Sequence, residues 1–201
     1  MQQLAVLASG RGSNFQALID AGARGHVPAT ISLLITDNPG AYAIERAKRA
    51  GIPCRIVDYS SYPSKDAYNA ALEDAMEQSG ADLFVLAGYM RILARSTVAR
   101  FAGKMINIHP ALLPSFPGLH AQRQALAYGV RISGCTVHFV DEGMDTGPII
   151  LQRCVEVLDG DDEDTLAERI LAEEHRALPD AVRLFFEGRL RIEGRRVRRL
   201  P

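Results

Sequence analysis

The amino-acid sequence predicts an α/β fold of the doubly wound, Rossmann-like type, in which a mostly parallel sheet is flanked by helices. Three observations support this prediction. Short apolar runs alternate with amphipathic segments through the first half of the chain, and the loops between them are short. A helix between two strands returns the chain to the same direction, which gives a parallel sheet. The chain has 201 residues, of which 47% are hydrophobic, so we expect one domain with a core of its own.

Each element of the first half is justified by its own pattern. Short apolar runs indicate buried strands, and apolar residues at helical spacing, such as Phe15 and Leu18, indicate helices. Ser64 is a suitable N-cap, and Gly51 and Gly80 follow the helices that they end. The expected strands are residues 3–8, 31–36, 55–58, 83–86 and 105–109. The expected helices are residues 14–23, 41–50 and 64–79.

The pattern changes after residue 110. A proline-rich loop at 112–118 leads to a short helix, and two strands flank a polar loop before a long helix. Gly194 lies near the centre of an expected terminal hairpin. These elements are expected at 121–128, 135–140, 149–157, 165–186 and 189–197.

The charge distribution excludes some classes of protein. A formal net charge of -1 argues against a protein that binds nucleic acid by broad phosphate neutralisation. The charge is uneven, because residues 159–164 hold five acids and residues 189–199 hold six arginines. The basic segment is expected to be a solvated ribbon, and contact with an acidic partner is the alternative.

The cysteines and the apolar runs indicate the compartment. Cys54, Cys135 and Cys154 lack metal-binding spacing and are odd in number, so we expect reduced thiols. Cys54 and Cys135 have apolar neighbours and are expected in the core. No apolar run approaches ~20 residues, and no charged leader precedes the first strand. We therefore predict a cytoplasmic protein with no membrane partner.

Asn107 and His109 are the first candidate catalytic residues. They lie two positions apart on the strand at 105–109, so they point from the same face, and Pro110 ends the strand. The amide can hydrogen-bond a developing oxyanion, and the imidazole can carry a proton near neutral pH. This pairing suits acyl-type transfer. A polar strand end capped by a surface histidine is the alternative.

The turn at 9–14 follows the first strand and opens a helix. Its glycines allow close approach of a ligand, and free amides at a helix start attract anions. The third glycine of the dinucleotide fingerprint is missing, and no Gly-Lys-Ser/Thr follows, so a monophosphate fits best. An ordinary capped turn is the alternative. In a parallel sheet this turn and the pair Asn107 and His109 both sit at carboxyl ends of strands, where ligands bind.

Other polar segments have two interpretations each. The loop at 141–148 carries three acids but lacks the EF-hand order, so it is either solvated or directs a carboxylate to His109, which would raise the pKa of that imidazole. Residues 89–93 either form one side of a site for a flat aromatic ligand or begin a buried helix. His138 alternates with Thr136 and Val140 in its strand and could reach the same ligand-binding edge of the sheet as His109. His175 has either a packing or a binding role.

Taken together, these segments resemble the small, single-domain phosphoribosylglycinamide formyltransferases of purine synthesis. The resemblance covers essentially the whole chain. It implies one formyltransferase domain at 1–201, with a phosphate- and nucleotide-binding half at 1–105 and a catalytic and folate-binding half at 106–201. It also implies formyl transfer from 10-formyltetrahydrofolate to the amine of glycinamide ribonucleotide, without a metal, by a monomer or homodimer. The strongest matches are residues 9–14, 86–93, 107–114, 117–120 and 137–140, with Asp145.

Roles follow from the resemblance position by position. The implied catalytic residues are Asn107, His109 and Asp145. The implied contacts to glycinamide ribonucleotide are Gly12, Ser13, Asn14 and Glu174. The implied folate-binding residues are Lys65, Met90, Arg91, Ile92, Leu93, Asn107, Val140, Asp141, Glu142, Gly143, Met144 and Asp145. Asn107 and protonated His109 would stabilise the formyl oxygen, while Asp145 would keep His109 charged and help to relay a proton.

The chain departs from the family at two positions. Lys65 stands where relatives often carry arginine, which keeps the charge but loses a bidentate fork. Leu171 occupies a position that is polar in some relatives.

Other activities share the Asn107, His109 and Asp145 set. Formyltetrahydrofolate hydrolase and methionyl-tRNA formyltransferase use the same chemistry, but each is expected to carry a further domain that this sequence does not show. A non-catalytic module that binds a phosphate ligand is an alternative from another class. A nicotinamide dehydrogenase is excluded by the incomplete glycine fingerprint.

Overall fold

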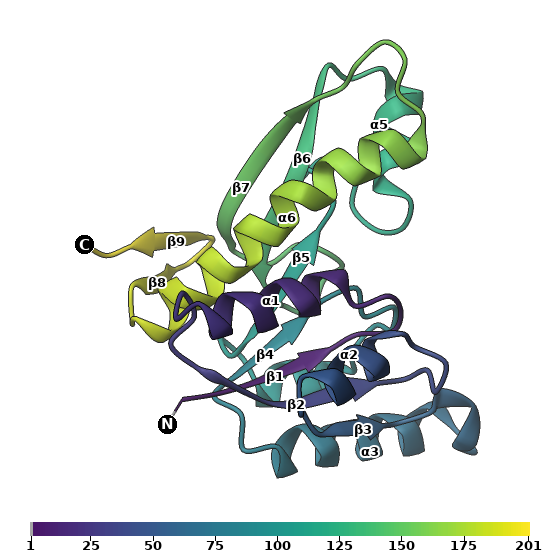
Figure 1. Ribbon diagram of the computed structural model, residues 1–201, viewed down its shortest axis with the longest axis vertical. Coiled ribbons are helices and arrows are strands. Elements are labelled where there is room, and N and C mark those ends of the chain that lie inside the picture. The colour runs from purple at the N-terminus through teal and green to yellow at the C-terminus, as the bar shows by residue number, and fades with distance from the viewer. Residues whose placement is uncertain (1) are drawn as a thin grey trace. The chain divides into compact units, whose positions relative to one another are not determined.

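A computed structural model describes residues 2–201, and the chain divides into two compact units at Ile106 and Asn107 (Figure 1). The boundary falls inside one strand, β5 (Met105–His109), which begins in the first unit and ends in the second. Each unit is described by itself.

The first unit is a parallel sheet covered by helices, as the sequence predicts. Its strands pair side by side in the order β3 (Cys54–Ile56), β2 (Thr30–Thr36), β1 (Gln3–Leu7) and β4 (Leu83–Leu86). The Phe84 amide donates to the Lys104 carbonyl at 2.8 Å, which sets the start of β5 beside β4. The helices are α1 (Ser13–Ala23), α2 (Ala43–Arg49), α3 (Lys65–Gln78) and α4 (Arg95–Arg100), with a 3-10 turn η1 (Tyr59–Ser61).

Burial explains why the central strands read as continuous apolar runs. Leu4, Val6, Leu83 and Val85 are all fully buried, because both faces of β1 and β4 are covered. The Ser64 side chain accepts a hydrogen bond from the Ala67 amide at 3.1 Å, which confirms the predicted N-cap of α3. The α/β fold with a mostly parallel sheet is confirmed.

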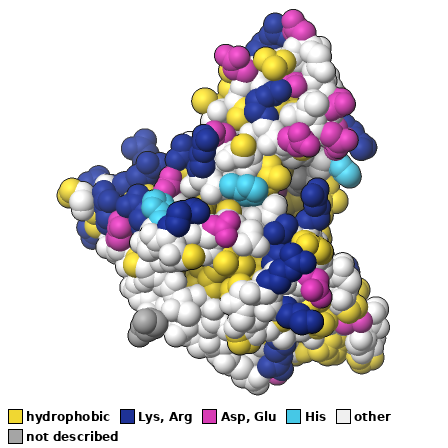
Figure 2. Space-filling view, in the orientation of Figure 1, with side chains coloured by type: hydrophobic (Ala, Val, Ile, Leu, Met, Phe, Trp, Pro, Cys, Tyr) yellow, Lys and Arg dark blue, Asp and Glu magenta, His cyan; other side chains and the backbone are white. Residues whose placement is uncertain are grey.

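The second unit has an antiparallel core. β6 (Ile132–Phe139) pairs antiparallel with β7 (Ile149–Glu156), and β9 (Arg196–Arg199) runs parallel to β7 at its first residue, Ile149. β8 (Leu190–Glu193) pairs antiparallel with β9 around Gly194, which confirms the terminal hairpin. Lys and Arg side chains gather over this hairpin in Figure 2.

Two helices complete the second unit. α5 (Ala121–Tyr128) is short, whereas α6 (Glu163–Phe186) packs against β6 and β7 along a buried stripe that includes Leu166, Ile170 and Ala177. A capping box between Asp162 and Thr165 begins α6. The acidic segment before this helix is therefore partly structural, not merely solvated.

Three sequence-based expectations need correction. Cys54 is exposed, because β3 is the outer strand of its sheet and its three residues are all exposed. β6 begins at Ile132, three residues before the expected start. The helix α4 was not predicted, because its six residues are too few to show helical periodicity.

Cys135 is buried, as expected, and all three cysteines are free. Within residues 2–201 no helix has both the length and the low polarity needed to cross a membrane.

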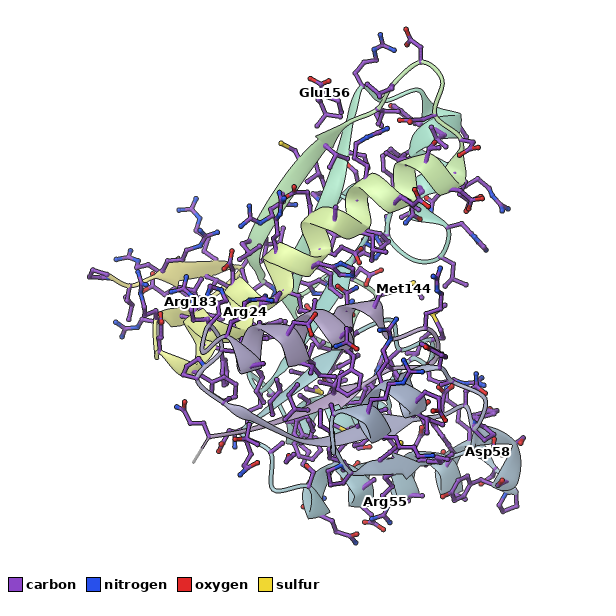
Figure 3. All side chains as sticks on the ribbon, viewed as in Figure 1. Arg24, Arg55, Asp58, Met144, Glu156 and Arg183 are labelled. Carbon is purple, nitrogen blue, oxygen red and sulfur yellow. The ribbon has the colours of Figure 1, made fainter. Side chains whose placement is uncertain are left out.

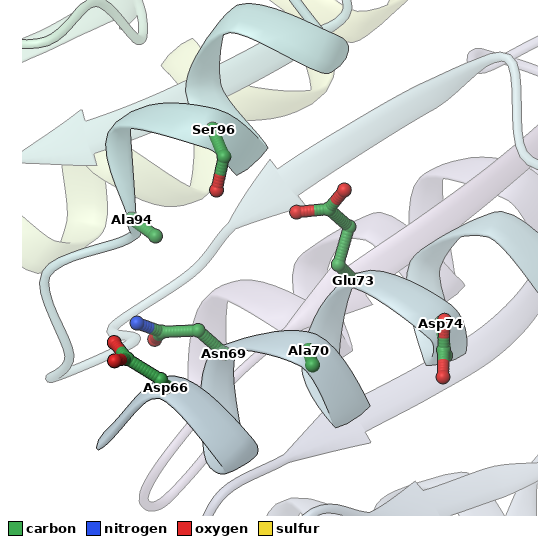
Figure 4. Close-up of a pocket in the computed structure, with 7 residues that line it drawn as sticks. All are labelled: Asp66, Asn69, Ala70, Glu73, Asp74, Ala94 and Ser96. Carbon is green, nitrogen blue, oxygen red and sulfur yellow. The ribbon is translucent and has the colours of Figure 1, made fainter.

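A shallow cavity of about 330 Å³ lies in the first unit between α3 and the start of α4 (Figure 4). Its lining is acidic and polar, and none of its residues is a predicted site residue. The lining residues are Asp66, Asn69, Ala70, Glu73, Asp74, Ala94 and Ser96.

Candidate active site

The predicted catalytic residues gather at one place in the second unit. Asn107 and His109 come from β5, and Asp145 comes from the loop after β6. Asn107 Nδ2 lies 3.3 Å from Asp145 Oδ1, and His109 Nδ1 lies 3.4 Å from Asp145 Oδ2. His138 of β6 joins them, with Nε2 3.2 Å from Asn107 Nδ2 and 3.7 Å from Asp145 Oδ1. We call these four residues the catalytic cluster.

His138 orients the Asn107 amide. Its Nδ1 lies 2.8 Å from the Phe139 carbonyl, which can only accept, so Nδ1 carries the hydrogen of the neutral ring. The other nitrogen, Nε2, is then an acceptor for the Asn107 amide. Both hydrogens of Asn107 Nδ2 therefore have partners, one on His138 and one on Asp145. Sequence analysis left the role of His138 open, and only its alternation along β6 pointed to this face.

His109 is held from both ring nitrogens. Nε2 lies 2.8 Å from the Phe116 carbonyl and donates to it, so Nδ1, which faces Asp145, is the nitrogen that can take up a proton. The residue is only 4% exposed. Burial lowers the pKa of His109 below its ordinary value, and the Phe116 carbonyl and the Asp145 carboxylate raise it only in part. The lowered pKa favours a neutral imidazole in the free protein, and the expectation that Asp145 keeps His109 charged stays a prediction.

Asp145 remains ionised. Burial raises the pKa of Asp145, but its contact with His138, the hydrogen bond from the Gly118 amide and the electrostatic effect of the nearby imidazoles outweigh burial and leave the pKa lowered. The Gly118 amide donates to Oδ2 at 2.8 Å. The backbone of Asp145 has a φ of 54°, a left-handed conformation that turns the side chain toward the cluster.

Side chains of β6 and β7 hold in place the loop that supplies the Phe116 carbonyl and the Gly118 amide. Thr136 Oγ1 donates to the Ala111 carbonyl at 2.6 Å and accepts from the Leu113 amide at 3.0 Å. Gln152 Nε2 donates to the Leu113 carbonyl at 2.9 Å. Sequence analysis missed the contributions of Phe116 and Gly118, because a backbone group leaves no signature in residue type.

The loop that carries Asp145 is closed by its own contacts. Asp141 Oδ1 accepts from Thr146 Oγ1 at 2.6 Å and from the Gly143 amide at 3.1 Å. A Cβ at Gly147 would lie 1.7 Å from the Phe139 carbonyl oxygen, so only glycine fits there. Arg195 of the terminal hairpin donates from Nη2 to the Thr146 carbonyl at 2.9 Å. The hairpin therefore touches this loop directly.

The predicted phosphate loop lies in the first unit, at the start of α1. Gly12 is the N-cap with a φ of 66°, and a Cβ there would lie 2.8 Å from Ala43 Cβ. Ser13 is the first helical residue, and no side chain caps the helix. Asn14 is buried. The first amides of α1 thus lack a side-chain cap and are suited to an anion.

The segment after β4 presents apolar side chains to solvent. Met90 is 62% exposed and Ile92 is 69% exposed, which is unusual for large apolar residues and suits a flat apolar ligand. The Met90 amide donates to Ser9 Oγ at 2.9 Å, and Arg91 Nε donates to Asp37 Oδ2 at 2.8 Å. Leu93 is half-buried.

The other predicted ligand contacts lie as follows. Lys65 is exposed at the first position of α3, and Glu174 is buried on α6. Met144 is exposed on the loop after β6 (Figure 3), as are Glu142 and Gly143, whereas Val140 and Asp141 are half-buried. Among residues 2–201, no group of three His, Cys, Asp or Glu side chains is placed to hold a metal ion. Leu171 and His175 lie on α6, outside the catalytic cluster.

Similarity to known proteins covers both units. The formyl transferase family matches residues 2–182. The structure of glycinamide ribonucleotide transformylase 1 from Symbiobacterium toebii is 52% identical, has a TM-score of 0.97, and aligns over 100% of this chain and 95% of its own. Phosphoribosylglycinamide formyltransferase of Escherichia coli K12 is 41% identical over 94% of this chain and 89% of its own length.

Longer relatives also match. The trifunctional purine biosynthetic protein adenosine-3 of Drosophila pseudoobscura pseudoobscura is 49% identical over 94% of this chain. This chain spans only 14% of that relative's length. Nearly all of the sequence, including every residue of the catalytic cluster, falls within the matched region. The chain therefore belongs to the formyl transferase family and groups within it with the phosphoribosylglycinamide formyltransferases.

Proposed function

We propose that this protein transfers the formyl group of 10-formyltetrahydrofolate to the amine of glycinamide ribonucleotide. The catalytic cluster of Asn107, His109, His138 and Asp145 is the observation that supports this proposal most strongly. It combines an amide donor, a buried imidazole and an ionised carboxylate within hydrogen-bonding range. Acyl transfer needs these three groups: a donor for the oxyanion, a proton carrier and a residue that stabilises the charged carrier.

The first step forms the new C–N bond. The neutral amine attacks the formyl carbon, the C=O double bond opens, and negative charge builds on its oxygen. Asn107 Nδ2 donates to that oxygen by giving up its longer contact, the 3.3 Å contact with Asp145. The shorter contact with His138, at 3.2 Å, keeps the amide oriented. One such donor contributes about 3 kcal/mol to the transition state in other oxyanion holes.

The second step breaks the bond between the formyl carbon and N10 of the folate. The attacking amine must lose a proton and N10 must gain one, so the proton count balances. His109 starts neutral because burial lowers its pKa, and its Nδ1 takes the proton from the amine. Asp145 stabilises the imidazolium at 3.4 Å, and His109 then passes the proton to N10 as the C–N10 bond breaks.

The binding assignments rest on residue chemistry. We assign the phosphate of the acceptor to Gly12, Ser13 and Asn14, where the amides of α1 lack a side-chain cap, and the remainder of the ribonucleotide to Glu174. The folate is assigned to the segment after β4, to the loop after β6, to Lys65 at the start of α3 and to Asn107. The residues of the two segments are Met90, Arg91, Ile92 and Leu93 after β4, and residues 140–145 after β6. We also propose a cytoplasmic protein that acts as a monomer or homodimer without a resident metal.

A spectrophotometric assay tests the proposal. Purified protein is mixed with 10-formyltetrahydrofolate, with and without glycinamide ribonucleotide, and loss of the formyl donor is followed. Loss that depends on the acceptor and yields formylated product is the expected result. Loss without the acceptor would replace the proposal with a hydrolase, and no loss in either mixture would leave a binding module.

A further inference from the structure

The carboxyl ends of β2, β1 and β4 are linked by hydrogen bonds of side chains that take no part in the proposed bond-making and bond-breaking steps. Asn38, after β2, donates from Nδ2 to the Ser9 carbonyl at 3.1 Å. Ser9, after β1, accepts from the Met90 amide, after β4, at 2.9 Å. The neighbouring residues Asp37 and Arg91 form the second tie, with Arg91 Nε 2.8 Å from Asp37 Oδ2. The folate-binding segment after β4 is thus anchored to the end of β2.

Asp37 is an unusual residue for this position. It is only 6% exposed, and its other carboxylate oxygen, Oδ1, is buried without a hydrogen-bond partner among residues 2–201. Arg91 therefore supplies the compensating charge for a carboxylate that is almost removed from water. Burying a carboxylate costs free energy unless it is paired, so we expect the pair of Asp37 and Arg91 to have a functional role.

Tyr59 fixes the plane of the Arg91 guanidinium. The guanidinium carbon lies 4.1 Å from the centroid of the Tyr59 ring, in cation–π contact. The 3-10 turn that carries Tyr59 is capped by Asp58, which accepts from the Ser60 amide at 2.9 Å and is labelled in Figure 3. Tyr59 also packs edge-on against Tyr68 of α3, with ring centroids 4.9 Å apart.

These contacts leave one edge of Arg91 available. Asp37 holds Nε and Tyr59 covers one face, whereas Nη1 and Nη2 have no hydrogen-bond partner in the part of the chain that the structure describes. The Arg91 side chain is 42% exposed. A guanidinium whose plane is fixed and whose terminal nitrogens are open is arranged to bind a carboxylate through two parallel hydrogen bonds.

We propose that Asp37, together with Tyr59, is a positioning residue that presents the Arg91 fork to a carboxylate of the folate glutamate tail. The proposal rests on the proposed function, because the tail belongs to the formyl donor. Lys65 at the start of α3 lacks a fork, so the planar recognition of the tail falls to Arg91. Asp37 and Tyr59 touch Arg91 and act through it.

The experiment compares two formyl donors in the unmodified protein and in its variants. Kinetics of the Asp37→Ala variant are measured with 10-formyltetrahydrofolate and with 10-formyltetrahydropteroate, which lacks the glutamate. We expect the KM for the complete donor to rise about tenfold at nearly unchanged kcat, since one well-oriented bidentate contact is lost. The KM for the donor without glutamate should not change. Asp74→Ala removes an exposed carboxylate of α3 that forms no ion pair among the described residues, and serves as the matched control.

Two further variants keep the test decisive if Asp37→Ala folds poorly. Tyr59→Leu and Asp37→Asn should each raise the KM for the complete donor by a smaller factor. Adding Asp37→Ala to Arg91→Ala should produce no further rise, because Asp37 acts through Arg91. An equal effect of Asp37→Ala on both donors, or a full additional effect in the Arg91→Ala background, would overturn the inference. If the unmodified protein does not turn over the complete donor, the proposed function itself fails, which is a distinct result.

Discussion

Asp145 connects the other members of the catalytic cluster. One oxygen accepts from the Gly118 amide and faces His109, and the other contacts Asn107. Its left-handed φ of 54° costs about 1 kcal/mol or more for a residue other than glycine. The loop after β6 therefore accepts a strained backbone at the one residue whose carboxylate reaches three partners.

Replacing Asp145 by Asn should depress kcat strongly. Asparagine retains the size and one oxygen but cannot stabilise the imidazolium of His109, so we expect kcat to fall roughly 100- to 1000-fold. Binding of both substrates, measured by calorimetry, should survive within a few-fold. Asp159→Asn, on the exposed loop before α6, is the control. Near-normal turnover of Asp145→Asn would remove this residue from the mechanism.

The buried His109 should make the protein less stable in mild acid. In the unfolded chain its pKa lies near the ordinary 6.5, whereas burial lowers the pKa in the folded protein. Between these two values the unfolded state binds more protons, so the free energy of unfolding falls as the pH drops below about 6.5. Asp145, whose pKa is lowered from 3.8, adds a loss of the same sign at lower pH.

Denaturant unfolding at several pH values measures this effect. His109→Gln should flatten the dependence of the free energy of unfolding between pH 5 and 7, approximate limits chosen around the ordinary histidine pKa. The activity of the unmodified protein should fall as the pH drops through the lowered pKa of His109, because a neutral His109 is needed to accept the proton. A pH dependence that is identical in the variant would show that His109 is not its source.

Residue type predicted some of these properties and not others. The two-residue spacing of Asn107 and His109 fixes their common face, so their proximity was predictable from the strand pattern alone. The direction of the pKa shift of His109 was not predictable, because it depends on how completely the surrounding residues exclude water. His138 could be placed on the correct face, but its partner, the Asn107 amide, is set by the packing of β5 and β6.

At the scale of elements, strong periodicity decided which predictions held. α1, α3 and α6 carry apolar stripes, α3 and α6 also have side-chain caps, and each helix lies within a few residues of its expected range. α4 is short and has no stripe, and β3 is an outer strand without buried positions, so neither leaves a reliable pattern. The turn between β1 and α1 was predictable because Gly12 has a backbone conformation, with a φ of 66°, that favours glycine.

Gly12→Ala tests that turn. The new Cβ would lie 2.8 Å from Ala43 Cβ at a φ of 66°, so we expect a loss of about 2 kcal/mol in the free energy of unfolding. The KM for glycinamide ribonucleotide should rise, because the first turn of α1 shifts. Gly10→Ala is a matched control in the same turn, since its Cβ would meet no atom within 4 Å. Equal effects of the two substitutions would argue against close packing at Gly12 as the cause.

The terminal hairpin is expected to support catalysis through Arg195. Its hydrogen bond to the Thr146 carbonyl holds the residue that follows Asp145. Arg195→Ala should lower kcat about threefold, in keeping with the loss of one hydrogen bond worth about 0.5–1.5 kcal/mol. Arg191→Ala, which removes an exposed arginine whose nearest acid is 3.8 Å away, is the control. Unchanged kcat in Arg195→Ala would leave the hairpin with only a packing role.

At the scale of the whole molecule, the chemistry and the predicted phosphate binding belong to different units. Residues 107–145 supply every member of the catalytic cluster, whereas the glycine-rich turn and the Asp37 and Arg91 pair lie in the first unit. The alternation of strands and helices predicted the parallel sheet of the first unit. The antiparallel pair β6 and β7 was recognisable as two strands, but its pairing was not predicted, because register depends on contacts between distant residues.

Removal of metal ions should not affect turnover. The proposed reaction needs only hydrogen-bond donors and a proton carrier, which the side chains supply. Protein dialysed against EDTA should therefore keep its kcat within error of the untreated sample. Loss of activity that returns on addition of a divalent cation would contradict the proposed mechanism.

The hydrogen bonds between Asn38, Ser9 and Met90 have a consequence for how ligand recognition could change. They join three loops of the first unit through one serine, so a substitution there alters several recognition segments at once, while the reacting groups of the second unit keep their own anchors in Thr136 and Gln152. Under the proposed function, variants at Ser9 would therefore change ligand binding through several loops at once and leave the catalytic cluster intact. Ser9 is thus a single position from which substrate preference could be altered in directed evolution.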